Sequence, residues 1–99
     1  MESKTYITNP KITIGIPVYN GEQFLRTCLN HLLMQTFTDF EIIISDNAST
    51  DSTRSICLEF VEKDKRIRYI RQDKNIGVIP NFYFVLQKAV GKYFMWAAV

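Results

Sequence analysis

The chain has 99 residues, 46% of them apolar, which suffices for one hydrophobic core and therefore for one domain or part of one. Its 12 basic and 10 acidic residues give a formal charge of +2, too weak a bias to indicate nucleic acid or an anionic membrane as a partner. Cys28 and Cys57 have no metal-ligand spacing, so neither a zinc site nor a disulfide framework is expected.

The N-terminus has no apolar signal core, and the longest apolar run, residues 93–99, is far shorter than the roughly 20 residues that span a bilayer. We therefore expect a cytoplasmic protein with reduced cysteines. A place at the cytosolic face of a membrane fits a longer parent protein equally well.

After a polar lead over residues 1–10, the chain alternates between two hydrophobic patterns. Residues 12–18 are β-branched or apolar at successive positions, which predicts a strand buried on both faces. Apolar residues then recur at three-to-four spacing, which predicts a helix over residues 22–35. Residues 40–45 repeat the strand pattern, and residues 55–62 repeat the helix pattern.

The second half continues this alternation. Residues 67–70 predict a short strand, residues 82–90 a helix that stops at Gly91, and residues 93–96 the start of another strand. Strands that alternate with helices imply right-handed crossovers and a mostly parallel sheet. We predict an α/β, Rossmann-like βαβαβαβ domain over residues 11–99, with helices on both faces of the sheet.

Two segments stand apart from this pattern. The densest basic stretch, residues 63–71, lies between periodic segments, and we expect it to be a solvated connector without a function. The chain ends inside the apolar strand that starts at Tyr93, which predicts an incomplete domain whose free sheet edge permits self-association. The alternative is a short natural protein that buries this strand in an oligomer.

Ligands of open α/β sheets bind beyond the carboxyl ends of the strands. Polar loops follow the first three predicted strands, at residues 17–22, 46–51 and 73–77, so all three are expected on that edge. The first loop has no G-x-G-x-x-G motif, and no G-x-x-x-x-G-K-[ST] P-loop occurs in the chain. Phosphate is therefore not expected to bind a glycine-rich turn.

Two residues of this edge suit a pyrimidine nucleotide. Tyr19 offers an aromatic face on which a base could stack, and Asp46 offers a carboxylate that could accept a hydrogen bond from the imide N–H of uracil. Each also has a plainer explanation, because Tyr19 could close the core and Asp46 could simply end a strand.

The remaining polar residues of these loops have plainer roles as well. Ser49, Thr50 and Asp51 are expected to cap the helix that follows them, a role that Asn47 could share. Glu22 could merely favour the positive end of the first helix. No nucleophile–base pair is visible, so the sequence predicts no catalytic residue.

Taken together, these residues resemble family 2 glycosyltransferases of the GT-A fold over about residues 11–97. The combination is far more specific than its parts. It comprises Pro17-Val18-Tyr19-Asn20 with Glu22, Gln35 ahead of Glu41-Ile42-Ile43-Ile44, Asp46-Asn47-Ala48-Ser49-Thr50-Asp51, Asn75 with Gly77, Asn81, and Gly91-Lys92-Tyr93-Phe94.

The resemblance implies a parent protein that transfers a sugar from a nucleoside diphosphate sugar, with UDP as the default nucleotide. The acceptor would be a hydroxyl on a saccharide, a lipid or a protein, and transfer would usually invert the anomeric carbon. The resemblance also implies the nucleotide-binding residues. Pro17 and Tyr19 would border the base, Asp46 would hold its edge, Asn20 and Glu22 would shape the pocket together with Asn47, and Asn75 and Asn81 would lie near the ribose and diphosphate.

The chain departs from the family pattern in two places. Pro80 stands where the family often has a basic residue, so one contact to the diphosphate is missing or supplied elsewhere. The family places its acidic D-x-D-like motif directly after the last strand, and this chain ends at Val99. A divalent cation, Mn or Mg, is expected in the parent, but its ligands are absent here, and we expect no turnover by the isolated chain.

The alternative function is non-enzymatic: a truncated or degenerate copy that binds a nucleotide or a partner subunit without chemistry. A phosphoacceptor signalling domain is disfavoured, because Tyr19 and Asn20 follow the first strand where such a domain would have an acidic pair.

Overall fold

The computed structural model describes residues 10–99, and the rest of the predicted polar lead, residues 1–9, lies outside the described residues. Strands and helices alternate as predicted. They are β1 (Ile12–Val18), α1 (Glu22–Leu33), β2 (Phe40–Asp46), α2 (Thr53–Lys63), β3 (Ile67–Arg71), α3 (Val78–Lys88) and β4 (Tyr93–Trp96). The strand bounds match the prediction to within one residue. Helices α2 and α3 begin two and four residues earlier than predicted, and α1 ends two residues earlier.

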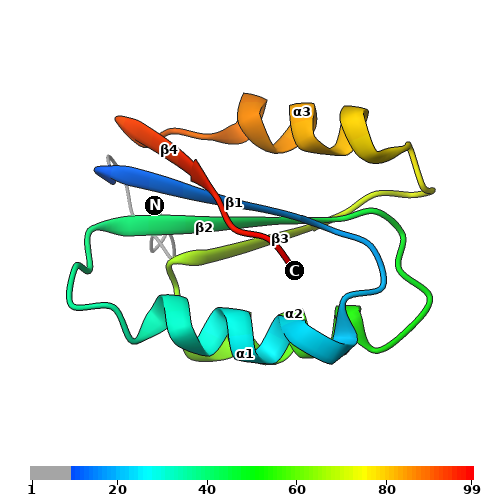
Figure 1. Cartoon of the computed structure of the whole chain (residues 1–99), viewed down its shortest axis with the longest axis horizontal. Coiled ribbons are helices and arrows are strands. Elements are labelled where there is room, and N and C mark those ends of the chain that lie inside the picture. The colour runs from blue at the N-terminus through cyan, green and yellow to red at the C-terminus, as the bar shows by residue number, and fades with distance from the viewer. Residues whose placement is uncertain (1–9) are drawn as a thin grey trace, which may run out of the picture.

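The four strands form one sheet in the order β3-β2-β1-β4, and every neighbouring pair is parallel. Helices α1 and α2 cover one face of the sheet, while α3 covers the other (Figure 1). The predicted α/β architecture, with helices on both faces, is therefore confirmed. Strands β3 and β4 are the edges.

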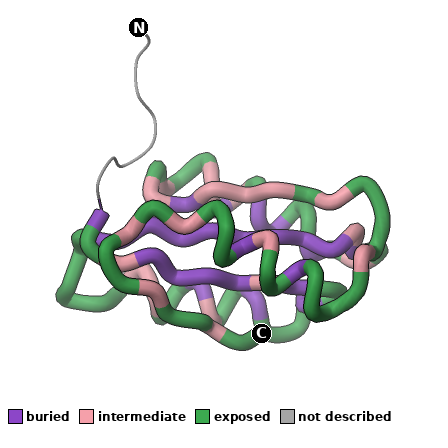
Figure 2. Tube along the Cα trace, turned by 90° about the horizontal axis from the view of Figure 1, so that it is seen from above, coloured by how far each residue is buried: buried purple, intermediate pink, exposed green. Residues whose placement is uncertain are grey.

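The central strands carry the core because both of their faces are covered. Strand β2 is buried at all seven positions, and β1 at five of seven. Figure 2 shows this buried stretch along the strands, with exposed residues on the outer turns of the helices and in the loops. Ile42 and Ile44 pack with α1 and α2 in one cluster, and burial of each such side chain stabilises the fold by about 1.5–3 kcal/mol.

A buried carboxylate joins the amino-terminal ends of the strands to the start of β4. Glu41 accepts hydrogen bonds from the Thr13 hydroxyl (2.7 Å) and from the Val90 N–H (3.1 Å), and its other oxygen lies 3.2 Å from Arg68. The Gly91 N–H donates to Thr13 Oγ1 (2.7 Å). This network fixes the connection between α3 and β4 against β1 and β2.

The expectation that residues 63–71 form a solvated connector was wrong. All of β3 lies within this stretch, beside the carboxylates of β2 and of the preceding turn. Arg66 pairs with Asp64 (2.8 Å), Arg68 with Glu41 (3.2 Å) and Arg71 with Asp46 (3.3 Å). Arg68 and Arg71 of the edge strand β3 thus neutralise carboxylates of β2 that are distant in the sequence.

Both cysteines are free; Cys57 is buried and Cys28 is half-buried. Burial and the negative charge of Asp46 raise the pKa of Cys57 to about 12, so this thiol stays protonated at neutral pH. Among the described residues, no helix is long and apolar enough to cross a membrane.

Acid should weaken the contact between the two helices that share a face of the sheet. Arg26 on α1 donates two hydrogen bonds to Glu59 on α2, and these, with Lys63, lower the pKa of Glu59 from 4.5 to about 2. A carboxyl whose folded pKa is lowered stabilises the fold above its unfolded pKa, and this contribution is lost as pH falls from about 4.5 to about 2.

We therefore expect the Tm, followed by circular dichroism, to fall over this pH range, and to fall less steeply in Glu59→Gln. The difference should be modest, because the pair is exposed to solvent. Identical pH dependence in the two proteins would contradict this account.

Candidate nucleotide-binding site

The three polar loops meet at the carboxyl edge of the sheet, as predicted. The Asn47 N–H donates to the carbonyl of Val18 at the end of β1 (2.8 Å), and the Gln72 N–H donates to the carbonyl of Asp46 at the end of β2 (2.8 Å). Because the strands are parallel, side chains that are 23 to 30 residues apart in the sequence become neighbours at this edge.

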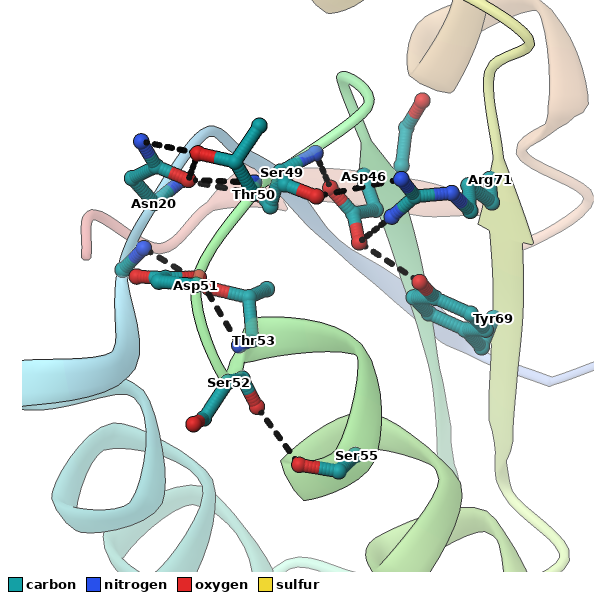
Figure 3. A network of polar contacts seen from close by, with 12 residues as sticks. Asn20, Asp46, Ser49, Thr50, Asp51, Ser52, Thr53, Ser55, Tyr69 and Arg71 are labelled. Atoms are coloured by element: carbon teal, nitrogen blue, oxygen red, sulfur yellow. Dashed lines mark hydrogen bonds and ion pairs between the residues drawn. The ribbon is translucent and has the colours of Figure 1, made fainter.

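Asn20 joins the first loop to the second. Its N–H donates to Ser49 Oγ (2.8 Å), and its side-chain oxygen accepts from the Thr50 N–H (2.8 Å), as Figure 3 shows. Asn20 has φ 52° and Ala48 has φ 64°, both in the left-handed region that few residues other than glycine adopt. Such backbone costs free energy and is concentrated at functional sites, where the surrounding contacts hold it in place.

Glu22 and Asp51 fix the first turns of α1 and α2 to each other. The Glu22 N–H donates to Asp51 Oδ2 (3.2 Å), and Glu22 Oε1 accepts from the Ser52 N–H (2.9 Å). Asp51 Oδ1 accepts from the Thr53 N–H at the start of α2 (2.9 Å). The predicted helix capping is thus found for Asp51 only, because Ser49 and Thr50 bind Asn20 instead.

Asn47 shapes the third loop. Its buried side-chain amide donates to Asn75 Oδ1 (3.0 Å) and to the Gly77 carbonyl (3.1 Å), and its oxygen accepts from the Ile76 N–H (2.8 Å). Gly77, at φ 93°, supplies the left-handed turn that leads into α3. Asn75 itself is exposed at the edge.

Asn81 does not reach the open edge. It is 3% exposed on the inner side of α3, where its oxygen accepts from Ser45 Oγ (2.6 Å) and its amide donates to the Ser45 carbonyl (3.1 Å). Both ends of the amide therefore anchor α3 to β2. Pro80 lies in the first turn of α3, where its missing N–H removes no helical hydrogen bond.

Asp46 is fully buried and carries the densest set of contacts at the edge. Oδ1 accepts from the Ser49 N–H (2.9 Å), while Oδ2 accepts from the Tyr69 hydroxyl (2.5 Å) and from Arg71 Nη1 (3.3 Å). Arg71 also donates to the Ser49 carbonyl (3.0 Å). In Figure 3 Tyr69 and Arg71 both extend from β3 toward this carboxylate.

Tyr69 and Arg71 were not predicted as site residues. Ile67, Tyr69 and Arg71 are at alternate positions of β3, so their side chains point to one face of the sheet, the face to which Asp46 of β2 also points. The sequence could have indicated this only if β3 were known to lie beside β2. Of the predicted site residues, Tyr19 is 49% exposed and Pro17 is half-buried at the end of β1. Tyr19, Asn20, Glu22 and Asn75 are exposed and Arg71 is partly exposed, so a ligand at this edge can reach these side chains.

Known proteins are similar to this chain in sequence and in fold. The family model of glycosyl transferase family 2 matches residues 13–97. The chain belongs to this family. Glycosyltransferase GlyA of Streptococcus pneumoniae is 45% identical over 72 residues, which are 73% of this chain and 10% of that protein.

Two solved structures have the same fold. S. aureus TarS, in complex with UDP-GlcNAc, superposes with a TM-score of 0.82 at 26% identity, over 89% of this chain and 26% of that one. The mannosyltransferase PcManGT from Pyrobaculum calidifontis, in complex with GDP-Man and Mn²⁺, gives 0.74 at 22% identity, over 84% and 25%. This family 2 chain thus spans between a tenth and about a quarter of each of the three proteins.

Proposed function

We propose that this chain forms the nucleotide-binding part of a glycosyltransferase. The parent protein transfers a sugar from a nucleoside diphosphate sugar, UDP by default, to a hydroxyl of a saccharide, lipid or protein acceptor, with inversion at the anomeric carbon. The isolated chain binds the nucleotide but does not turn over. Family membership and the likeness to TarS, solved with UDP-GlcNAc, support this proposal.

The observation that carries the proposal is the placement of Asp46. Its carboxylate ends β2 beside the loop that bears the exposed ring of Tyr19. An ionised carboxylate accepts about four hydrogen bonds, and three are already made, so Oδ1 can accept one more. Because the Asp46 side chain is fully buried, we propose that a covering group, such as the partly exposed Arg71, moves aside when the base binds. We propose that a base stacks on Tyr19, bordered by Pro17, and donates its imide N–H to Asp46.

The other predicted residues divide into two groups. Asn75 faces solvent and is proposed to contact the ribose or the diphosphate directly, with Arg71 as the nearby cation. Asn20, Glu22, Asn47 and Asn81 use their polar atoms on neighbouring loops and on Ser45, so their proposed role is to hold the shape of the pocket.

The family's divalent cation does not fit the residues of this chain. Between residues 10 and 99, no three His, Cys, Asp or Glu side chains come close enough to hold a metal ion. We propose that Mn or Mg binds ligands elsewhere in the parent protein. Nucleotide binding by this chain should therefore be independent of metal.

Two further proposals concern the parent and the free edge. A parent at the cytosolic face of a membrane is compatible with this chain.

Strand β4 is an edge strand of the described sheet and has exposed side chains at Tyr93, Met95 and Trp96. Beside it lies an apolar cavity of about 320 Å³, lined by Ile12, Ile14, Leu32, Gln35, Phe37, Phe40 and Met95. We propose that this edge pairs with another strand, including that of a second copy.

Calorimetry of UDP and CDP with the purified chain, with and without Mn²⁺, tests the proposed function. We expect UDP to bind equally well in both conditions and about tenfold more tightly than CDP, because N3 of uracil carries a hydrogen and N3 of cytosine is an acceptor. Failure of the folded chain to bind UDP, or equal affinity for the two nucleotides, would contradict the proposal.

A further inference from the structure

Asp46 is held by donors that come from two different directions. The Ser49 N–H, from the loop above β2, binds Oδ1, and the Tyr69 hydroxyl, from β3, binds Oδ2. Two donors on different oxygens fix the rotation of a carboxylate about its χ2 torsion, which is otherwise broad. The plane of the Asp46 carboxylate is thus set before any ligand arrives.

Tyr69 is better suited to this task than Arg71, which binds the same oxygen. Arg71 lies directly opposite Asp46 in the strand register, at a longer distance of 3.3 Å, and divides its hydrogen bonds between Asp46 and the Ser49 carbonyl. Its side chain is 33% exposed. Arg71 can therefore turn toward a ligand, whereas its departure would leave Asp46 still bound by Tyr69.

The ring of Tyr69 is fixed by the core. Tyr69 pairs with Ile44 in the register, two residues before Asp46 on β2, and packs against the buried cluster under α1 and α2. The length of the phenol spans this two-residue offset and brings the hydroxyl to Oδ2. The packing of the Tyr69 ring against the core therefore determines the position of its hydroxyl.

We propose that Tyr69 is a positioning residue for the nucleotide: its hydroxyl orients the Asp46 carboxylate so that the free lone pair of Oδ1 faces the base. This inference rests on the proposed function of Asp46. Tyr69 lies on β3, outside the three loops that supply the predicted site residues. Its proposed effect on nucleotide affinity is exerted entirely through Asp46.

The protonation state of Tyr69 is consistent with this role. Burial, followed by the hydrogen bond to Asp46 and its negative charge, raises the pKa of Tyr69 above its ordinary value of 10.0. The hydroxyl therefore remains a donor throughout the neutral range.

A double-mutant cycle on the 99-residue chain tests the proposal, with UDP as the probe. Calorimetry would measure UDP affinity for the original chain, Tyr69→Phe, Asp46→Asn and the double variant, and circular dichroism would give the Tm of each. Phenylalanine keeps the ring that packs on the core and removes only the hydroxyl. We expect Tyr69→Phe to lose about tenfold in affinity, and Asp46→Asn to lose at least as much.

The decisive comparison is the effect of Tyr69→Phe in the Asp46→Asn background. If Tyr69 acts through Asp46, the second substitution changes affinity by less than about twofold there. Tyr83→Phe, which removes a hydroxyl from an exposed tyrosine of α3, is the matched control and should bind UDP like the original chain.

Three results would overturn the inference, and they are distinguishable. Unchanged affinity in Tyr69→Phe while Asp46→Asn binds weakly would remove the positioning role alone. Full tenfold losses that add in the double variant would mean that Tyr69 acts on the fold and not through Asp46. Unchanged affinity in Asp46→Asn would remove the proposed function of Asp46, and the inference with it.

Discussion

Replacing Asp46 by alanine should weaken UDP binding by about a hundredfold. The substitution removes the carboxylate that ends β2, and hydrogen bonds to a charged group contribute about 1.5–3 kcal/mol. It also removes the acceptor of the Tyr69 hydroxyl, the Ser49 N–H and the Nη1 group of Arg71. The pocket would therefore lose its proposed base-binding group, which is also the acceptor that these three donors share.

Calorimetric titration at 25 °C measures this effect, and Glu59→Ala provides the control. Glu59 pairs with Arg26 and Lys63 on the outer side of the α1–α2 layer, so its removal should leave UDP affinity unchanged. Comparable losses in the two variants would indicate a general loss of structure. Unchanged affinity in Asp46→Ala would show that this residue does not hold the base.

Gly91→Ala should destabilise the fold by about 3 kcal/mol. A Cβ at this position would lie 2.5 Å from the Thr13 nitrogen and 2.7 Å from the Ile12 carbonyl carbon, both of them backbone atoms of β1. Backbone in a central strand cannot give way as a flexible side chain can. The start of β4 would have to leave β1, and the Gly91–Thr13 hydrogen bond would be lost with it.

Gly21→Ala is the matched control, because its Cβ would meet only side-chain atoms of Val18 and Val99. Thermal unfolding followed by circular dichroism should show a fall in Tm of roughly 12–24 °C for Gly91→Ala, at about 4–8 °C per kcal/mol for a chain of this size. The fall for Gly21→Ala should be clearly smaller. Equal falls would mean that the close approach of Gly91 to β1 does not limit stability.

The elements and their order follow from the sequence because periodicity is a local property. Three consecutive isoleucines, at residues 42–44, are typical of a strand covered on both faces, and the three-to-four spacing around Leu25 and Leu29 suits one face of a helix. The early start of α3 was missed because Val78 and Ile79 are exposed and Pro80 resembles a helix break. Pro80 is accommodated because the first helical N–H groups need no helical partner.

The sequence by itself thus determined the alternating elements, the parallel sheet, the gathering of three loops at one edge, and the family. Only the tertiary structure decided which polar atoms meet there: Tyr69 and Arg71 on Asp46, Glu22 with Asp51, and Asn81 beneath α3 on Ser45. The physical reason is that hydrophobic periodicity is read within one segment, whereas a hydrogen bond requires two atoms within about 3 Å. For residues on different strands and helices, that distance is set by strand order, register and packing.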